Sequence, residues 1–393
     1  MLRSCKGINL RDPRIMDQWI RECIGRHHKR FDFQAMMCDF GNPQGFYASL
    51  PVYDKMILDI GQYVADSITA RRLELKPVSI RERRDGSSGK IRQIGCESAL
   101  QQIFDYVAKG ASHEIWARRI VPQQVSSIRD RGPIVGVKMI RGWIDADNAQ
   151  MEYRQRHGMR YSSTCRLHTK LDCQKCFPHG DKEKFIAKFE KDCANQDLVW
   201  LWDALLSTHR VGDYHGFLIG ALTSEWAMQY LLSFAYREIM AMHNRRGAQL
   251  ITHALWYMDD ALLIGKSRGD MMAAIDHITE YCAQEIGQII KPDWQILPLK
   301  DHPIDMMGYL LYRSGRNAIR DRNWIKTRRL IIRSDPDGLS FKQAQRIMSY
   351  KGYIDNSNNY RINTGLKVQH IYRQARGALR KGNRNADESL LYR

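Results

Sequence analysis

The spacing of apolar and polar residues predicts a helix and a β-hairpin in the first quarter of the chain. From residue 53 to residue 73, apolar side chains recur every three or four positions, as in an amphipathic helix. Two short strand-like runs follow at 73–80 and 90–96. They flank a basic, turn-rich loop over 83–90, so the pattern predicts a hairpin that closes over an anionic ligand.

Helical and strand-like segments alternate through the middle of the chain. Ser98 is placed to cap one helix, and Pro133 to open another that continues through Trp143. Strand-like runs over 169–177 and 254–265 are each followed by a helical pattern. This alternation predicts a layered α/β or α+β fold.

The charge of the chain points to a polyanionic partner. Its 393 residues include 61 Lys or Arg against 43 Asp or Glu, a formal net charge of +18, and 44% of them are hydrophobic, enough for a large core. Residues 313–393, mostly helical in pattern with Ser340 as a cap, hold 19 Lys or Arg and 6 Asp or Glu. This segment carries 13 of the 18 excess charges, and we expect it to contact nucleic acid.

Other features of the sequence argue against a membrane or secreted protein. No apolar run reaches the roughly 20 residues that cross a bilayer, and the N-terminus lacks an apolar segment of signal-peptide length. The nine cysteines are scattered, without the density of a disulfide framework. We expect a soluble cytoplasmic protein with no membrane partner.

One cluster has the residue types that zinc accepts as ligands. Cys165, His168, Cys173 and Cys176 form a C-x2-H-x4-C-x2-C pattern. The gap between the two pairs is far shorter than in ordinary zinc sites, and alternating side chains of a strand do not converge easily on one tetrahedron. We therefore expect half-buried cysteines and no zinc.

The most informative segment contains two adjacent acids, Asp259 and Asp260. Apolar residues flank both of them, where burying a charge is costly. The pattern predicts a tight β-hairpin whose tip lifts both carboxylates out of the sheet, where they can hold Mg²⁺ or Mn²⁺. A solvent-exposed turn without a metal is the alternative.

A further acid is expected on a neighbouring strand. Two ions roughly 3.5–4 Å apart, which clamp the attacking and leaving oxygens of an in-line displacement, need carboxylates from both sides. Asp172 ends a short strand-like run and meets this requirement. The alternative is that Asp172 is a turn or cap residue.

Three motifs in series resemble those of reverse transcriptases. Residues 257–260 match the Tyr-x-Asp-Asp signature, and 172–177 match the first metal motif, in which an Asp is followed by four residues and an aromatic. Residues 220–224 match the Gly-x3-Ser motif that lies between them. Order and spacing agree as well, and the resemblance covers about residues 80–315.

This resemblance implies an α+β right-hand polymerase with an antiparallel sheet in the palm. Residues 1–70 would form a helical N-terminal extension, 71–160 the fingers, 161–315 the catalytic palm and 316–393 a basic helical thumb. The implied activity is that of an RNA-directed DNA polymerase, a nucleotidyltransferase that extends a DNA or RNA primer with dNTPs on an RNA template.

The resemblance also implies roles for the residues of the palm. Asp172 and Asp259 would bind two Mg²⁺ or Mn²⁺ ions with the incoming dNTP, and Asp260 would support them at the edge of the site. The backbone carbonyl of Cys173 would complete the coordination. Phe177 would lie under the sugar and exclude a 2′-hydroxyl, although without the motif it is equally a core residue.

In the fingers and thumb, the resemblance implies contacts with phosphates. Arg92 would bind the triphosphate through its guanidinium fork. Lys90 is a further ligand for the triphosphate, with a solvated hairpin tip as the alternative, and Gly220 would allow a template or nucleotide to approach closely. The thumb residues that would grip the template–primer backbone without reading its sequence are Arg328, Arg329, Arg346 and Lys351.

Departures from the common pattern point to one branch of the family. Ile219 precedes the glycine, as in enzymes of diversity-generating retroelements, whereas Glu225 only approximates the glutamine of that branch. Trp294 stands where the family often has a lysine near the leaving pyrophosphate, and Lys291 is close to it.

The sequence leaves two biological settings and one alternative function open. An enzyme of a diversity-generating retroelement would work with a structured non-coding RNA and an accessory protein. An antiphage defence reverse transcriptase is the alternative. A nucleic-acid-binding protein with a vestigial polymerase site is the alternative from another class.

Overall fold

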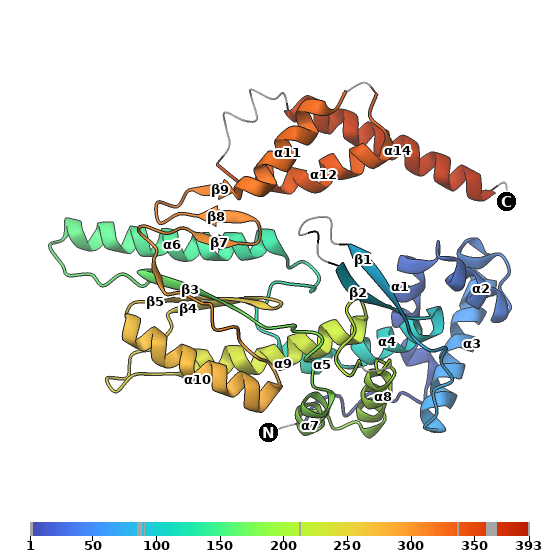
Figure 1. Ribbon diagram of the computed structural model, residues 1–393. Coiled ribbons are helices and arrows are strands. Elements are labelled where there is room, and N and C mark those ends of the chain that lie inside the picture. The colour runs from blue at the N-terminus through green and yellow to red at the C-terminus, as the bar shows by residue number, and fades with distance from the viewer. Residues whose placement is uncertain are drawn as a thin grey trace.

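The protein contains a four-stranded antiparallel sheet with strand order β4-β5-β3-β6. Its strands β3, β4 and β5 lie between layers of helices (Figure 1). Its strands are β3 (Leu167–Asp172), β4 (His253–Tyr257), β5 (Asp260–Gly265) and β6 (Leu297–Pro298). Helix α6 covers one face, and α9 and α10 cover the other (Figure 1). These helices span Pro133–Arg156, Leu222–Ala241 and Arg268–Ile286. The computed structural model describes residues 3–84, 89, 91–211, 214–335, 338–358 and 368–391.

The two faces of this sheet belong to different hydrophobic cores. Along β5, Ala261 and Leu263 pack into the larger core with α9 and α10, whereas Leu262 and Ile264 pack into a second core with α6. Side chains alternate across a strand, so a strand with both faces covered needs apolar residues at every position. This requirement explains the unbroken apolar run that follows Asp260.

The N-terminal helices are part of the larger core. They are α1 (Asp17–His27), α2 (Phe31–Asp39) and α3 (Leu50–Thr69), with short 3-10 helices η1 (Pro13–Met16) and η2 (Gly45–Tyr47). They share that core with α4 (Ala99–Ala111), α5 (His113–Arg119), α7 (Lys182–Asp192) and α8 (Gln196–Ser207). The helix expected over 53–73 is α3, which begins earlier because Pro51 fits the first turn of a helix.

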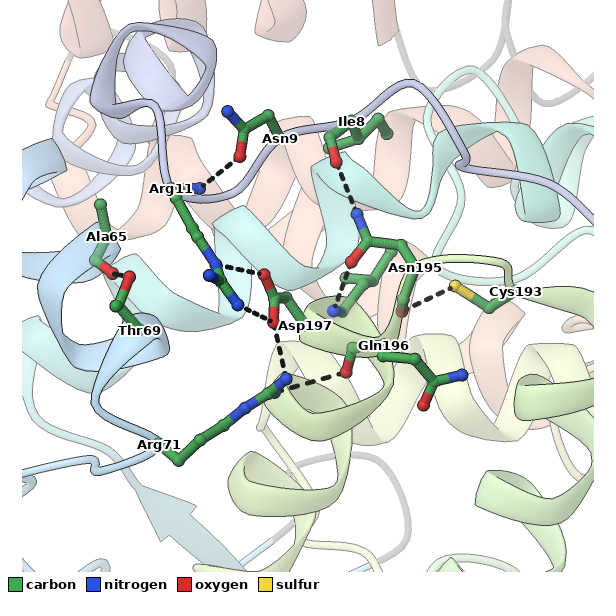
Figure 2. Close-up of polar contacts among 11 residues, drawn as sticks. Ile8, Asn9, Arg11, Ala65, Thr69, Arg71, Cys193, Asn195, Gln196 and Asp197 are labelled. Atoms are coloured by element: carbon green, nitrogen blue, oxygen red, sulfur yellow. Dashed lines mark hydrogen bonds and ion pairs between the residues drawn. The ribbon is translucent and has the colours of Figure 1, made fainter.

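Polar contacts also fix the N-terminal segment to the start of α8 (Figure 2). Asp197 binds Arg11 at 2.9 Å and Arg71 at 2.6 Å, so one carboxylate joins two parts of the segment. Asn195 donates a hydrogen bond to the carbonyl of Ile8 at 2.6 Å. Residues 3–70 are therefore built into the body of the protein.

The predicted hairpin exists, but its first strand is displaced. β1 (Ser79–Arg84) pairs with β2 (Ile91–Cys96), with Arg83 opposite Arg92. The strand expected over 73–80 begins only at Ser79, because Pro77 has no N–H to donate to a ladder. Lys90 and most of the loop tip lie outside the described residues.

The predicted helix starts near Ser98 and Pro133 are confirmed. The Ser98 side chain accepts a hydrogen bond from the backbone N–H of Gln101 and caps α4. Helix α6 starts at Pro133 but continues to Arg156, well beyond the predicted end, because neither proline nor glycine follows Gly142 before Gly158.

The C-terminal part forms a third core of its own. A small antiparallel sheet of β7 (Ile304–Met306), β8 (Tyr309–Leu311) and β9 (Asn317–Ile319) leads into α11 (Asp321–Arg333), α12 (Phe341–Asp355) and α14 (Val368–Leu391). Ile331, Ala344 and Tyr372 are buried among these helices. Ser340 caps α12 in a capping box with Gln343, which confirms the prediction for Ser340. Among the described helices, none is both long and apolar enough to cross a membrane.

Candidate active site

The turn between β4 and β5 carries Asp259. Tyr257 pairs with Asp260, so Met258 and Asp259 are the two residues of the loop. Met258 has a φ of 53°. This is the left-handed region, which glycine adopts freely and which L residues other than Asn and Asp seldom adopt. Such a conformation costs about 1–3 kcal/mol and persists where the surroundings enforce it. The expectation that both acids occupy the tip is wrong for Asp260, because a two-residue loop places it in the strand.

Asp172 lies directly opposite Asp260 in the sheet. β3 and β5 are antiparallel neighbours, and Asp172 is the register partner of Asp260. The next residue, Cys173, donates its backbone N–H to the carbonyl of Asp259 at 3.0 Å. The acids of two separate motifs therefore meet at one end of the sheet, on neighbouring strands as the sequence predicted.

Two lysines accompany these acids. Lys291 Nζ lies 2.6 Å from Asp172 Oδ1, and its backbone N–H binds the Asp172 carbonyl at 2.9 Å. Lys170 Nζ lies 3.7 Å from Asp260 Oδ1. Lys170 is not among the predicted site residues, although its position two residues before Asp172 places it on the same face of β3.

Crowded negative charge shapes the electrostatics of the site. Burial raises the pKa of Asp259, repulsion from Asp260 and Asp172 adds to the shift, and Arg92 opposes it. Burial likewise raises the pKa of Asp260, and Lys170 opposes that shift. A cation beside these groups would favour their ionised forms.

The donors at this end of the sheet fit a hard divalent cation. Asp172 and Asp259 offer carboxylates, and Cys173 offers a backbone carbonyl, whereas Asp260 is paired with Lys170. Mg²⁺ is commonly held by one or two carboxylates together with substrate phosphates and water. Among the described side chains, no group of three or more His, Cys, Asp or Glu is arranged to hold a metal unaided. Any ion here would thus depend on other oxygens, as the phosphates of a nucleotide provide.

In the structure, Cys165 and His168 of the C-x2-H-x4-C-x2-C pattern have partners elsewhere, whereas Cys173 and Cys176 are hydrogen-bonded to each other. The expectation of half-buried cysteines is wrong, because all three thiols are covered by the cores on the two faces of the sheet. Cys165 is buried and its thiol contacts the Trp143 carbonyl at 3.6 Å. His168 Nε2 lies 2.9 Å from the His302 carbonyl. Cys173 and Cys176 are buried in the larger core beside the active-site turn.

Arg92 and Gly220 place the hairpin beside this site. Arg92 is exposed on β2, and its charge acts on Asp259. Gly220 has a φ of 99°, and a Cβ there would lie 3.0 Å from the Ile94 side chain. The adjoining Ile219 carbonyl accepts a hydrogen bond from the N–H of Gly95 at 2.9 Å. Gly220 thus has a structural reason for lacking a side chain, namely the docking of β2 against the start of α9.

The remaining motif residues lie within the protein. Phe177 is half-buried against the larger core, and its carbonyl accepts from the N–H of Phe217 at 2.8 Å. Ser224 is buried with its hydroxyl 3.3 Å from His209 Nδ1.

Gln229, also buried, supports the loop that precedes α6. It donates to the Ser126 carbonyl at 2.7 Å, accepts from the Gln124 side chain at 2.9 Å and lies 4.0 Å from the Met258 sulfur. This buried amide therefore links the loop before α6 to the Met258 side chain of the turn. No local pattern marks Gln124, because its partner is 105 residues away.

The basic residues predicted in the thumb differ in exposure. Arg328 and Arg329 are exposed on α11, and Arg346 is exposed on α12. Lys351 is half-buried, forms an ion pair with Asp355 and lies over the Tyr372 ring at 5.3 Å. The three arginines are therefore better placed than Lys351 to reach a ligand.

Comparisons with known proteins find distant structural neighbours, two of which are telomerases. No protein-family profile and no curated protein sequence matches the chain. Telomerase from Candida albicans, solved with a fragment of telomeric RNA, aligns with 84% of this chain and 73% of its own at 10% identity and a TM-score of 0.42. Telomerase from Candida tropicalis, also solved with such a fragment, aligns over 89% and 67% at 8% identity and a TM-score of 0.46. At these scores the likeness does not assign the chain to a family.

Proposed function

We propose that the chain is an RNA-directed DNA polymerase whose active site contains Asp172, Asp259 and Asp260. The observation that carries the proposal is the register of β3 against β5, which brings acids of two separate motifs to one end of the sheet. The resemblance of these motifs to reverse transcriptases supplies the reaction: a primer 3′-hydroxyl attacks the α-phosphate of a dNTP, and pyrophosphate leaves.

The site fits a two-metal reaction. Two Mg²⁺ or Mn²⁺ ions, held by Asp172, Asp259 and the Cys173 carbonyl, would supply positive charge to the attacking and leaving oxygens. Arg92 would orient the triphosphate from β2 through its guanidinium group. Lys291, whose pKa is raised by its hydrogen bond with Asp172, holds a proton on Nζ beside the reacting phosphates.

Two further parts of the chain would select and hold the substrates. Phe177 follows the turn after β3, where its ring would exclude the 2′-hydroxyl of an NTP by size. The exposed arginines of α11 and α12 would contact the template–primer backbone, in line with the large positive charge of this segment.

Primer extension on an RNA template tests this proposal. Purified wild-type protein, with Mg²⁺ or Mn²⁺, is expected to incorporate dNTPs, and Asp259→Ala to abolish extension. Asp276→Ala, which removes an exposed acid on α10, is the matched control and is expected to retain activity. Incorporation of NTPs in place of dNTPs would contradict the proposal.

A nucleic-acid-binding protein with a vestigial site is the second candidate. The observation that favours it is the pairing of Asp172 with Lys291 and of Asp260 with Lys170, which neutralises both acids within the protein. On this hypothesis RNA binding persists, no template supports extension, and divalent ions leave the affinity for RNA unchanged.

For the biological setting, we propose a diversity-generating retroelement, with antiphage defence as the alternative. Ile219 before the glycine is the residue that favours the retroelement. In that setting a structured RNA and an accessory protein would be partners. A template repeat paired with a variable repeat beside the gene would support it, and defence genes without such repeats would support the alternative.

A further inference from the structure

A cavity outside the carboxylate site lies between α1, α4, α5 and α9. Its volume is about 650 Å³, within the usual range for small-ligand sites. Three tryptophans line it, Trp19, Trp116 and Trp226, together with polar residues that include Lys109 and Arg129. None of these residues belongs to the three motifs that resemble those of reverse transcriptases.

The tryptophans are held in place by close packing. A Cβ on Gly110 would lie 2.4 Å from the Trp19 ring, so the glycine allows that indole to lie directly on α4. The rings of Trp116 and Trp226 have their centroids 5.4 Å apart. Trp226 is half-buried, whereas the other two are nearly covered, so Trp226 offers the most aromatic surface to a ligand.

The charges around the cavity select among possible ligands. Lys109 Nζ lies 5.8 Å from the Trp226 ring centre and 3.5 Å from Glu22, and Arg129 is highly exposed at the rim. Glu22 also lines the cavity and pairs with Lys109, and Arg129 lies 3.8 Å from Asp130, so Lys109 and Arg129 are the two cations that an anionic group of a ligand would approach. An aromatic ring attached to a phosphate satisfies both the indoles and the two cations.

The cavity is connected to the active-site turn through two segments. Trp226 lies nearly one helical turn before Gln229 on α9, and Arg129 lies three residues after Ser126. Gln229 binds the Ser126 carbonyl and contacts Met258, the residue before Asp259. These two segments therefore join the lining of the cavity to the residues that surround the active-site turn.

We propose that this cavity binds a base of a single-stranded nucleic acid, stacked on Trp226, with the adjoining phosphate at Lys109 and Arg129. The identification of that strand as template rests on the proposed polymerase function. The binding of a single strand to the tryptophans does not depend on catalysis.

Fluorescence anisotropy with a labelled 12-nucleotide uridine oligomer tests the site without dNTPs or divalent ions. Loss of one stacking partner is worth 1–3 kcal/mol per base, so Trp226→Leu is expected to raise Kd by about tenfold. Trp226→Phe should keep most of the affinity, because it keeps a ring. Trp200→Leu, at a half-buried tryptophan on α8 that lines no part of the cavity, is the matched control and should change nothing.

Photocrosslinking locates the base directly and guards against a folding defect in the variants. An oligomer with 5-iodouridine should crosslink to the wild-type peptide that contains Trp226 or Trp116, and Lys109→Gln should weaken binding and lower the salt slope by about 1. Crosslinks confined to the hairpin or the C-terminal helices would overturn the proposal. So would an unchanged Kd for Trp226→Leu, or AMP that binds as tightly as the oligomer.

The two proposals can fail separately. Crosslinking at the tryptophans in a protein that extends no primer would leave the binding site standing and refute the polymerase. Primer extension by a protein whose oligomer never contacts the tryptophans would do the reverse.

Discussion

Asp172, Asp259 and Asp260 share one end of a sheet but differ in their surroundings. Asp172 and Asp260 each have a lysine partner, at 2.6 and 3.7 Å. Asp259 lies next to Met258, whose positive φ marks a strained turn. We infer that the lysines hold positive charge near the acids before substrate arrives, while the turn fixes the position of Asp259.

Lys291 offers a test of this arrangement at a single residue. Lys291→Met should lower kcat by about 10²-fold or more, the size of effect that loss of a positioned proton donor produces. Its stability should fall by no more than about 1 kcal/mol, because both partners of the pair are more than a third exposed. Primer extension and thermal unfolding measure the two effects.

Lys300→Met provides the control for Lys291→Met, since Lys300 is an exposed lysine outside the site. Equal losses of activity in both variants would show that Lys291 has no special role.

Phe177 offers a second test, this time of substrate choice. Phe177→Val should raise kcat/KM for NTPs relative to dNTPs by about 10- to 200-fold, the range over which the shape of an apolar pocket discriminates. Incorporation of dNTPs should persist, because the contact of Phe177 with Phe217 is made by its backbone. Single-nucleotide extension with each substrate measures the ratio, and an unchanged ratio would assign Phe177 to the core alone.

At the scale of elements, α6 is fastened to the sheet by one buried carboxylate. Asp147 accepts hydrogen bonds from Tyr161, Ser163 and Thr164 at 2.6–2.7 Å and pairs with Arg313 at 2.5 Å. Tyr161 to Thr164 lead into β3, and Arg313 follows β8. The Asp147 side chain thus joins α6 to the sheet that contains β3 and to the sheet that contains β8.

The pKa of Asp147 makes this fastening dependent on pH. Burial alone would raise the pKa, but hydrogen bonds from Thr164, Tyr161 and Ser163 hold it well below its ordinary value. A lowered pKa contributes stability that is present above about pH 4, the ordinary Asp value, and is lost as pH falls further. Wild-type protein should therefore lose stability below about pH 4.

Asp147→Asn should remove about 3–5 kcal/mol from the free energy of unfolding at pH 7, because it leaves Arg313 buried beside a neutral group. Urea unfolding at pH 7 and pH 3.5 measures both effects. The variant should lose less stability on acidification than wild type does. Asp145→Asn, at an exposed acid on the same helix, is the control. Equal acid sensitivity of wild type and Asp147→Asn would contradict this explanation.

Local sequence predicted the elements well where a single residue type decides the outcome. Ser98 and Ser340 cap helices because a hydroxyl satisfies a free backbone N–H. The pattern predicts a strand start at residue 73, whereas Pro77, which has no N–H to donate, delays the start to Ser79. The apolar neighbours of the acids mark them as site residues. They do not predict that Asp172 lies opposite Asp260, because this register depends on the packing of both sheet faces.

Residues whose role depends on distant partners were not predictable. Gln124 binds a residue 105 positions away, and Trp19 and Trp226, separated by more than half the chain, line one cavity. Nothing in their immediate sequence marks them. The same limit applies to the N-terminal segment, which the pattern predicts as an extension and the structure builds into the main core.

At the scale of the whole molecule, the first and third hydrophobic cores of the described residues differ in their independence. The largest contains buried residues from α1 and α3 together with α4, α8 and α9, whereas the third contains α11, α12 and α14. Removing the helices of the third core leaves the first intact. Removing the N-terminal helices opens the first.

Two truncations test this difference. A chain that lacks residues 1–70 should aggregate, because it exposes the apolar faces that α1 and α3 cover. A chain that ends at residue 320 should remain folded, with weaker and less salt-dependent RNA binding because much of the positive charge is gone. Size-exclusion chromatography and circular dichroism distinguish the outcomes, and a soluble, folded product without residues 1–70 would contradict the view of one shared core.

The hydrogen bond from Asn195 to Ile8 has a consequence for synthesis. Its two residues are 187 positions apart. At 5–20 residues per second on the ribosome, Ile8 emerges about 10 to 40 s before Asn195 exists. During that interval α1, α2 and α3 can pack on one another and on α4, but the residues that α8 and α9 add to the same core do not yet exist. The earliest part of the chain thus completes its final contacts only after the middle of the chain has been made.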